Sequence, residues 1–126
     1  MKIGFYHSCF LEWDIDKTFA WGKEHGFSGI ELHGGPRCKH LNWAEVAEGR
    51  ASSAVLRAQD KYGLPIIGIM YGALPFLSPD PSRRQEAQQY IEMLFKAAAN
   101  LGVKVVSAFT GRDPLLTLEQ NLERFG

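Results

Sequence analysis

Short apolar runs alternate with longer amphipathic segments four times along the 126-residue chain. The apolar runs predict β-strands at residues 2–7, 28–33, 65–71 and 103–109. The run at 65–71, PIIGIMY, is mostly apolar, as expected of a strand that is covered on both faces. Because strands and helices alternate at this pitch, we expect right-handed crossover units and a parallel sheet.

The segments between the apolar runs carry the start and stop signals of helices. They predict helices at 15–25, 43–48, 52–62 and 81–101, and a further helix that begins at 118. Asp14, Asn42 and Asp80 stand at N-cap positions, and Thr117 with Gln120 can form a capping box. The helix at 81–101 has the clearest amphipathic stripe. Its apolar positions are Ala87, Tyr90, Ile91, Leu94, Phe95, Ala98 and Leu101.

This order of elements suits either an open doubly wound sheet or a closed barrel. A dinucleotide-binding open sheet needs a G-x-G-x-x-G turn after its first strand, whereas this chain has HSCF at 7–10. A flavodoxin-like domain of five strands stays an alternative. A barrel of eight units takes roughly 250 residues, so four units in 126 residues correspond to half of one. We therefore predict an α/β fold of parallel (β/α) units, an incomplete (half) TIM barrel.

In this interpretation residues 1–126 are the N-terminal half of a single (β/α)8 domain, truncated in the helix after strand four. Four such strands have two open edges and an uncovered apolar inner face. We therefore expect a fragment, a pair of copies that combine, or a missing half on a separate chain.

Charge and composition exclude several classes of function. The 14 Lys and Arg residues balance the 14 Asp and Glu residues, which gives no electrostatic case for nucleic acid or an anionic membrane. No segment approaches the roughly 20 apolar residues of a membrane helix, and the start has no signal-peptide pattern. Cys9 and Cys38 are interpreted as reduced thiols, so we expect a cytoplasmic protein.

Candidate site residues follow the predicted strands. In the second strand Ile30 and Leu32 share one face, which should meet the helices, while Glu31 and His33 point inward. Glu31 either serves the site or pairs with a basic residue of a neighbouring strand. His33 lies at the carboxyl end of its strand, where barrel active sites form.

Other candidates lie at the same end of the sheet. His7 ends the first strand, where it is either a functional residue or a purely structural histidine. Met70 and Tyr71 end the third and suit a pocket wall or plain core. Arg112 follows the fourth strand and either holds a substrate phosphate or carboxylate or lies in a surface turn. Arg37 is a similar anion candidate.

A metal site within this chain is not predicted. Cys38 and His40 form a C-x-H pair near His33, but the paired ligand spacing of a zinc site is absent. His25 stands at a helix C-terminus, where an imidazole complements the helix dipole.

Several segments together resemble a known family. They are KIGFYHSCF, GFSGIELHGGPR, GIMYGALPFLSPDP and LGVKVVSAFTGRDP followed by TLEQNLERF. In this order they resemble the sugar phosphate isomerase/epimerase family of the xylose isomerase-like barrel superfamily, which also includes endonuclease IV. The resemblance covers essentially the whole chain.

The resemblance implies a small-molecule sugar substrate and a divalent metal, Mn, Mg, Co or Zn, which polarises the sugar while carboxylates move a proton. The family's metal ligands lie on later strands, so no metal ligand and no catalytic base is carried over, and no metal is expected on this chain alone. The resemblance places His7, Glu31, His33 and Met70 or Tyr71 in the substrate pocket.

We therefore expect the N-terminal part of a metal-dependent sugar or sugar-phosphate isomerase/epimerase, inactive alone. The alternatives are an endonuclease IV-like repair enzyme and a non-catalytic half-barrel that forms homo-oligomers through its open edges.

Overall fold

The computed structural model describes residues 1–38 and 40–125. Its strands form one parallel sheet in the order β1-β2-β3-β4. Their bounds are β1 Gly4–Tyr6, β2 Gly29–His33, β3 Ile66–Tyr71 and β4 Val106–Ala108. Each strand pairs with the next in sequence, without the reversal of strand order that defines a doubly wound sheet. The architecture is therefore that of half a barrel, as predicted, and the flavodoxin-like alternative is wrong.

The predicted helices all form, within one or two residues of their expected limits. They are α1 Ile15–Glu24, α2 Trp43–Ala47, α3 Ser53–Tyr62, α4 Pro81–Asn100 and α5 Leu118–Phe125. A short 3-10 helix, η1, occupies His7–Phe10. No helix of the described residues is long and apolar enough to span a membrane.

Side-chain caps explain where the helices begin. The Asp14 carboxylate accepts a hydrogen bond from the backbone N–H of Lys17 at 2.7 Å, and Asp80 caps α4 in the same way. Thr117 and Gln120 form the predicted reciprocal box, with hydrogen bonds of 3.2 and 2.9 Å. These local signals are visible in the sequence, so the helix starts could be predicted well.

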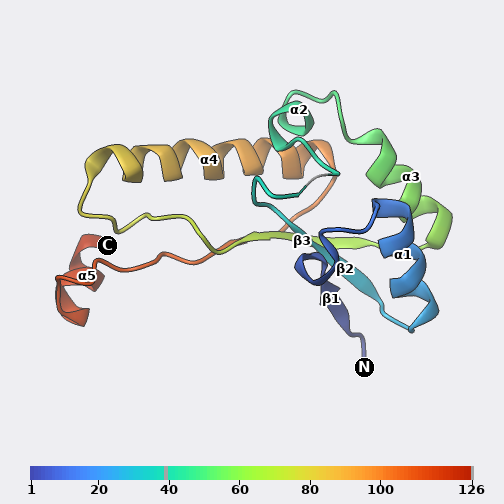
Figure 1. Cartoon of the computed structure of the whole chain (residues 1–126), viewed down its shortest axis with the longest axis horizontal. Coiled ribbons are helices and arrows are strands. Elements are labelled where there is room, and N and C mark those ends of the chain that lie inside the picture. The colour runs from blue at the N-terminus through green and yellow to red at the C-terminus, as the bar shows by residue number, and fades with distance from the viewer. Residues whose placement is uncertain (39, 126) are drawn as a thin grey trace.

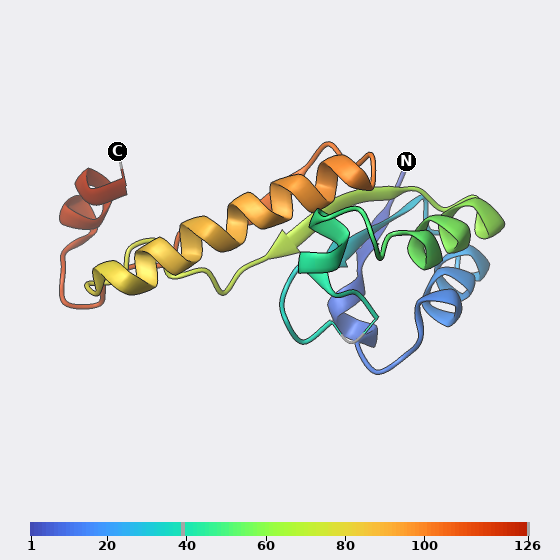
Figure 2. The same ribbon diagram turned by 90° about the horizontal axis from the view of Figure 1, so that it is seen from above.

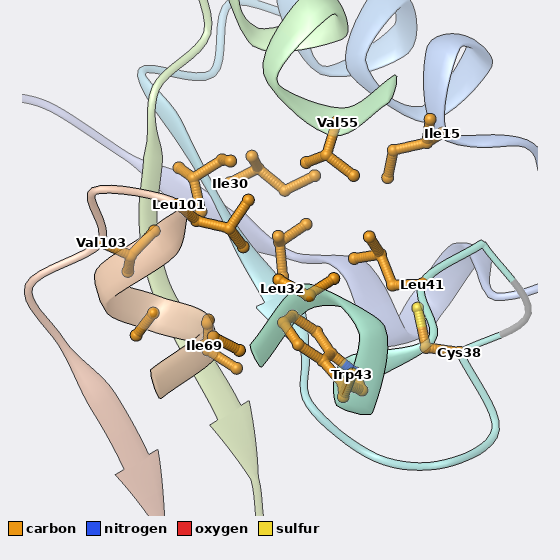
Figure 3. Close-up of a cluster of buried hydrophobic side chains, with 14 of the residues drawn as sticks. Ile15, Ile30, Leu32, Cys38, Leu41, Trp43, Val55, Ile69, Leu101 and Val103 are labelled. Atoms are coloured by element: carbon orange, nitrogen blue, oxygen red, sulfur yellow. The ribbon is translucent and has the colours of Figure 1, made fainter. Parts of the chain in front are cut away.

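The core lies between the sheet and the helices on one face of it. Ile30 and Leu32 are fully buried there, beneath helices that pair as α1 with α3 and α2 with α4. Figure 3 shows both side chains between those of the surrounding helices and loops. In α4 the predicted stripe is wrong at Phe95, which is 54% exposed, while Ala97 is fully buried. A 3–4 spacing therefore locates the buried face of this helix but not its edges.

The opposite, barrel-facing side of the sheet is open. β3 carries one extra residue there, because Ile30 pairs with Ile66 but Glu31 pairs with Gly68. The extra residue is Ile67, whose side chain covers the positions where Cβ atoms of Gly4 and Gly29 would lie. Ile67 stays 48% exposed, so the described residues do not complete a second core on this side.

α5 lies at the opposite end of the molecule from α1 and α3 (Figures 1 and 2). It is tied to the preceding loop by Asn121, whose side chain accepts from the backbone N–H of Asp113 and donates to its carbonyl. Its apolar side chains Leu118, Leu122 and Phe125 remain exposed. This helix therefore presents an unpartnered apolar face.

Candidate functional site

Polar side chains gather on the barrel-facing side of the sheet at the carboxyl ends of β1, β2 and β3. The strand register sets Tyr6 opposite Glu31, and His33 opposite Met70. The alternation of side chains along β2 therefore places Glu31 and His33 inward and Ile30 in the helix-side core, as predicted.

The Tyr6 hydroxyl joins the three strands. It lies 2.7 Å from Nδ1 of His33 and donates a hydrogen bond of 3.1 Å to the carbonyl of Met70. Burial raises the pKa of Tyr6, and the nearby negative charge of Glu31 acts in the same direction. Tyr6 is thus a neutral hydroxyl at the centre of the site.

His33 is held from several sides. Its ring is buried beside Tyr71, with ring centroids 5.9 Å apart in an edge-on arrangement. Its backbone carbonyl accepts a 3.2 Å hydrogen bond from the Trp43 indole. Burial lowers the pKa of His33, and the positive charge of Arg37 lowers it further. At neutral pH the site therefore presents a neutral, fixed imidazole.

The loop after β2 is shaped by two close approaches. The Tyr90 hydroxyl of α4 donates to the carbonyl of Gly34 at 2.9 Å. A Cβ on Gly35 would lie 2.5 Å from Nε2 of His33 and 2.6 Å from the Tyr71 ring. Gly35 is therefore required for the loop to pass this close to the site.

His7 does not end a strand, which corrects the prediction. β1 stops at Tyr6, and the chain turns there into η1. The turn carries the His7 side chain to a fully buried position beside His40, with ring centroids 6.5 Å apart. Neither ring nitrogen of His7 has a hydrogen-bond partner among the described residues. Burial, followed by the charges of His40 and His33, lowers its pKa to about 4.

Glu31 has no basic partner among the described residues. Its carboxylate lies across β3, where Oε1 is 3.1 Å from the position that a Cβ of Gly68 would take. Of the two alternatives for Glu31, pairing with a basic side chain of a neighbouring strand is therefore not found among the described residues, and the residue opposite it on β3 is Gly68.

Arg112 lies outside this cluster. It lines a separate open cavity of about 310 Å³ between the loops that follow β3 and β4, together with Arg83 and Ser78. A neighbouring cavity of similar size includes Tyr71, Tyr90 and Arg83. The predicted site residues are therefore brought together as Glu31, His33, Met70 and Tyr71, with His7 behind them and Arg112 apart.

The described residues do not fit a metal. No group of three or more His, Cys, Asp or Glu side chains in residues 1–38 and 40–125 is arranged to hold one. Burial raises the pKa of the Cys38 thiol, which disfavours the thiolate that a metal binds. His25 takes the predicted helix-end role, since its Nδ1 bonds the Trp21 carbonyl at 2.9 Å.

Sequence reasoning missed Tyr6 and Gly35. The same alternation that was applied to β2 also indicates Tyr6, because Gly4 and Tyr6 share the inward side of β1. No local signal reports the fit of Gly35 against His33 and Tyr71, because that fit depends on two strands and a loop meeting in space.

Comparisons with known proteins agree with this geometry. A family model described as the xylose isomerase-like TIM barrel matches residues 19–126. Fourteen chains of solved structures match. One is the apo form of 3-keto-D-glucoside 4-epimerase, YcjR, from E. coli, with 25% identity and a TM-score of 0.72. The match covers 98% of this chain and 46% of the epimerase, so this chain spans about half of that protein's length. No curated protein matches the chain.

Proposed function

Since the chain belongs to the xylose isomerase-like TIM barrel family, we propose that it supplies part of the substrate pocket of a sugar or sugar-phosphate isomerase or epimerase. The observation that carries the proposal is the cluster of Tyr6, Glu31 and His33 at the carboxyl rim of a half-barrel. Hydroxyl, carboxylate and neutral imidazole groups are suited to bind the hydroxyls of a sugar. The similarity to a sugar epimerase supports the same assignment.

We further propose that the reaction depends on a divalent metal and that this chain alone is inactive. A metal would polarise the sugar carbonyl or hydroxyl. The described residues of this chain form no site for one, so its ligands would come from elsewhere in the complete barrel. The role of Glu31, His33 and Tyr6 is then to bind and orient the sugar. Two free cysteines, Cys9 and Cys38, suit the reducing cytoplasm.

Two measurements on the purified chain test this function. In D2O with Mn²⁺ and D-fructose, we expect no deuterium exchange at the carbon next to the carbonyl above the blank. Binding of the sugar should instead move the NMR signals of Tyr6, Glu31 and His33. Glu31→Gln should weaken binding about tenfold, because a charge-assisted hydrogen bond contributes about 1.5 kcal/mol or more.

The matched control is Glu24→Gln, at the exposed end of α1. It should leave the affinity unchanged. Exchange above the blank would show that the chain is active alone. Sugar-induced shifts outside the rim, or equal effects of the two variants, would remove the case for a pocket at this site.

A second candidate is a self-associating half-barrel, which is favoured by the apolar surface left open. Ile67 and Val105 on the barrel-facing side are each about half exposed, and α5 is apolar along one face. A twofold axis would pair the β4 edge of each copy with the β1 edge of the other, which closes an eight-stranded ring.

Sedimentation of the chain over a range of concentrations tests this candidate. We expect a dimer that Ile67→Lys dissociates, since the lysine would be buried on the barrel side. Phe95→Lys, at an equally exposed apolar position on the helix side, should leave the dimer intact. A monomer at all concentrations would refute self-association.

A further inference from the structure

The Tyr6 hydroxyl has one proton and two close neighbours that compete for it. The Met70 carbonyl, 3.1 Å away, can only accept a hydrogen bond. Nδ1 of His33, 2.7 Å away, donates or accepts according to which ring nitrogen carries the proton of the neutral imidazole. The two contacts together therefore decide the tautomer of His33.

Only one assignment satisfies both contacts. If Nδ1 carries the proton, it donates to the Tyr6 oxygen, and Tyr6 donates to the Met70 carbonyl, which makes two hydrogen bonds. If Nε2 carries the proton, Tyr6 must donate to Nδ1 and its contact with Met70 is lost. Nε2 has no partner among the described residues, so this second form would also bury an unpaired N–H. The first assignment keeps one more hydrogen bond and buries no unpaired N–H, so it is the more stable.

We propose that Tyr6 is a positioning residue that holds neutral His33 in the Nδ1-protonated tautomer, so that Nε2 presents a lone pair to a sugar hydroxyl. The assignment of the ligand rests on the proposed function, whereas the tautomer follows from the contacts of Tyr6. Nε2 lies against Gly35 and beside the Tyr71 ring. Nε2 is itself buried, so a sugar hydroxyl reaches its lone pair only if the Gly35 loop moves away from the ring, and there it would meet an acceptor and not a donor.

The tautomer is measured directly by two-dimensional ¹H–¹⁵N NMR of the imidazole at pH 8. Burial lowers the pKa of His33 below its usual 6.5, so the ring is neutral there. We expect a pyrrole-type shift for Nδ1 and a pyridine-type shift for Nε2. A pyridine-type Nδ1, or a charged ring, would overturn the proposal in the unmodified chain.

Tyr6→Phe removes the hydroxyl and should convert His33 to the Nε2-protonated form or a mixture of both. Tyr71→Phe is the matched control, because Tyr71 contacts the same imidazole but its hydroxyl makes no hydrogen bond within the part of the chain that the structure describes. It should leave both shifts unchanged. A Tyr6→Phe chain that keeps the wild-type shifts would refute the positioning role.

The ligand is tested in the same spectra by adding D-fructose. A sugar hydroxyl that donates to Nε2 should move that shift away from the pyridine range and leave Nδ1 in place. If sugar leaves Nε2 unmoved but the tautomer is as expected, the sugar assignment fails and the positioning role of Tyr6 stands. If Mn²⁺ alone changes the chemical shift of Nε2, the lone pair binds a metal and the assignment to a sugar hydroxyl is wrong.

Discussion

The buried histidine behind the site makes the stability of the chain depend on pH. His7 is fully buried, and neither of its ring nitrogens has a partner among the described residues. Burial, followed by the charges of the His40 and His33 imidazoles, lowers its pKa from 6.5 to about 4. The folded chain therefore requires neutral His7, while the unfolded chain accepts a proton below pH 6.5.

The size of the effect follows from this difference in pKa. The contribution of neutral His7 to the free energy of unfolding is fully present well above pH 6.5. It falls as the pH decreases towards 4, because in that range only the unfolded state binds the proton. The slope approaches about 1.4 kcal/mol per pH unit. From pH 7.5 to pH 4.5, His7 alone should remove about 2.5 kcal/mol from the free energy of unfolding. Below pH 4 both states are protonated and the loss stops growing.

Urea unfolding followed by tryptophan fluorescence measures this loss in the wild-type chain and in His7→Leu. Leucine removes the titration and no hydrogen bond, so the pH dependence should flatten by about 2.5 kcal/mol over that range. The pKa of Asp16 and of Asp80 is lowered, so these two carboxylates stay largely charged at pH 4.5.

Two results would refute the reasoning. One is a wild-type free energy of unfolding that does not change between pH 7.5 and 4.5. The other is a His7→Leu chain that keeps the wild-type slope, which would assign the titration to another group. His33 contributes in the same direction in both chains, so the difference between them isolates His7.

Two further predictions concern packing. Leu94→Ala should lower the free energy of unfolding by about 2–5 kcal/mol, because Leu94 is fully buried, whereas Phe95→Ala on the next, exposed position should change it by less than about 1 kcal/mol. Equal losses in urea unfolding would contradict the buried face assigned to α4. Gly35→Ala should cost about 1–3 kcal/mol and move the NMR signals of His33 and Tyr71, because its Cβ would meet both rings. A variant with wild-type stability and spectra would show that the loop adapts without cost.

The elements and their order could be predicted because their signals are local. Caps such as Asp14 and Asp80, and the apolar runs of the strands, depend on residues within a few positions of one another. The inward placement of Glu31 and His33 followed from alternation along a single strand. These features need no knowledge of which strands meet.

The features that could not be predicted from the sequence depend on pairing between distant segments. The extra residue Ile67 changes the side of β3 that the preceding side chain faces, and the adjacent Gly68 is its one local mark, because an isolated glycine within a strand suggests a bulge. Whether Glu31 meets a cation depended on Gly68 lying opposite it, 37 positions away in the sequence. His7 left the predicted strand because β1 ends at Tyr6 and the chain turns into η1.

The barrel-facing side of the sheet carries both the exposed apolar side chains and the polar residues of the candidate site. Its lower part presents Ile67 and other exposed apolar side chains that require cover. Its rim presents Tyr6, Glu31 and His33, beside a sheet to which the described residues contribute four strands. In the proposed dimer, the second half-barrel that covers Ile67 would also place its strands beside the rim residue His33. Closure and binding of the proposed sugar would then be thermodynamically linked, so that each would strengthen the other by the same factor.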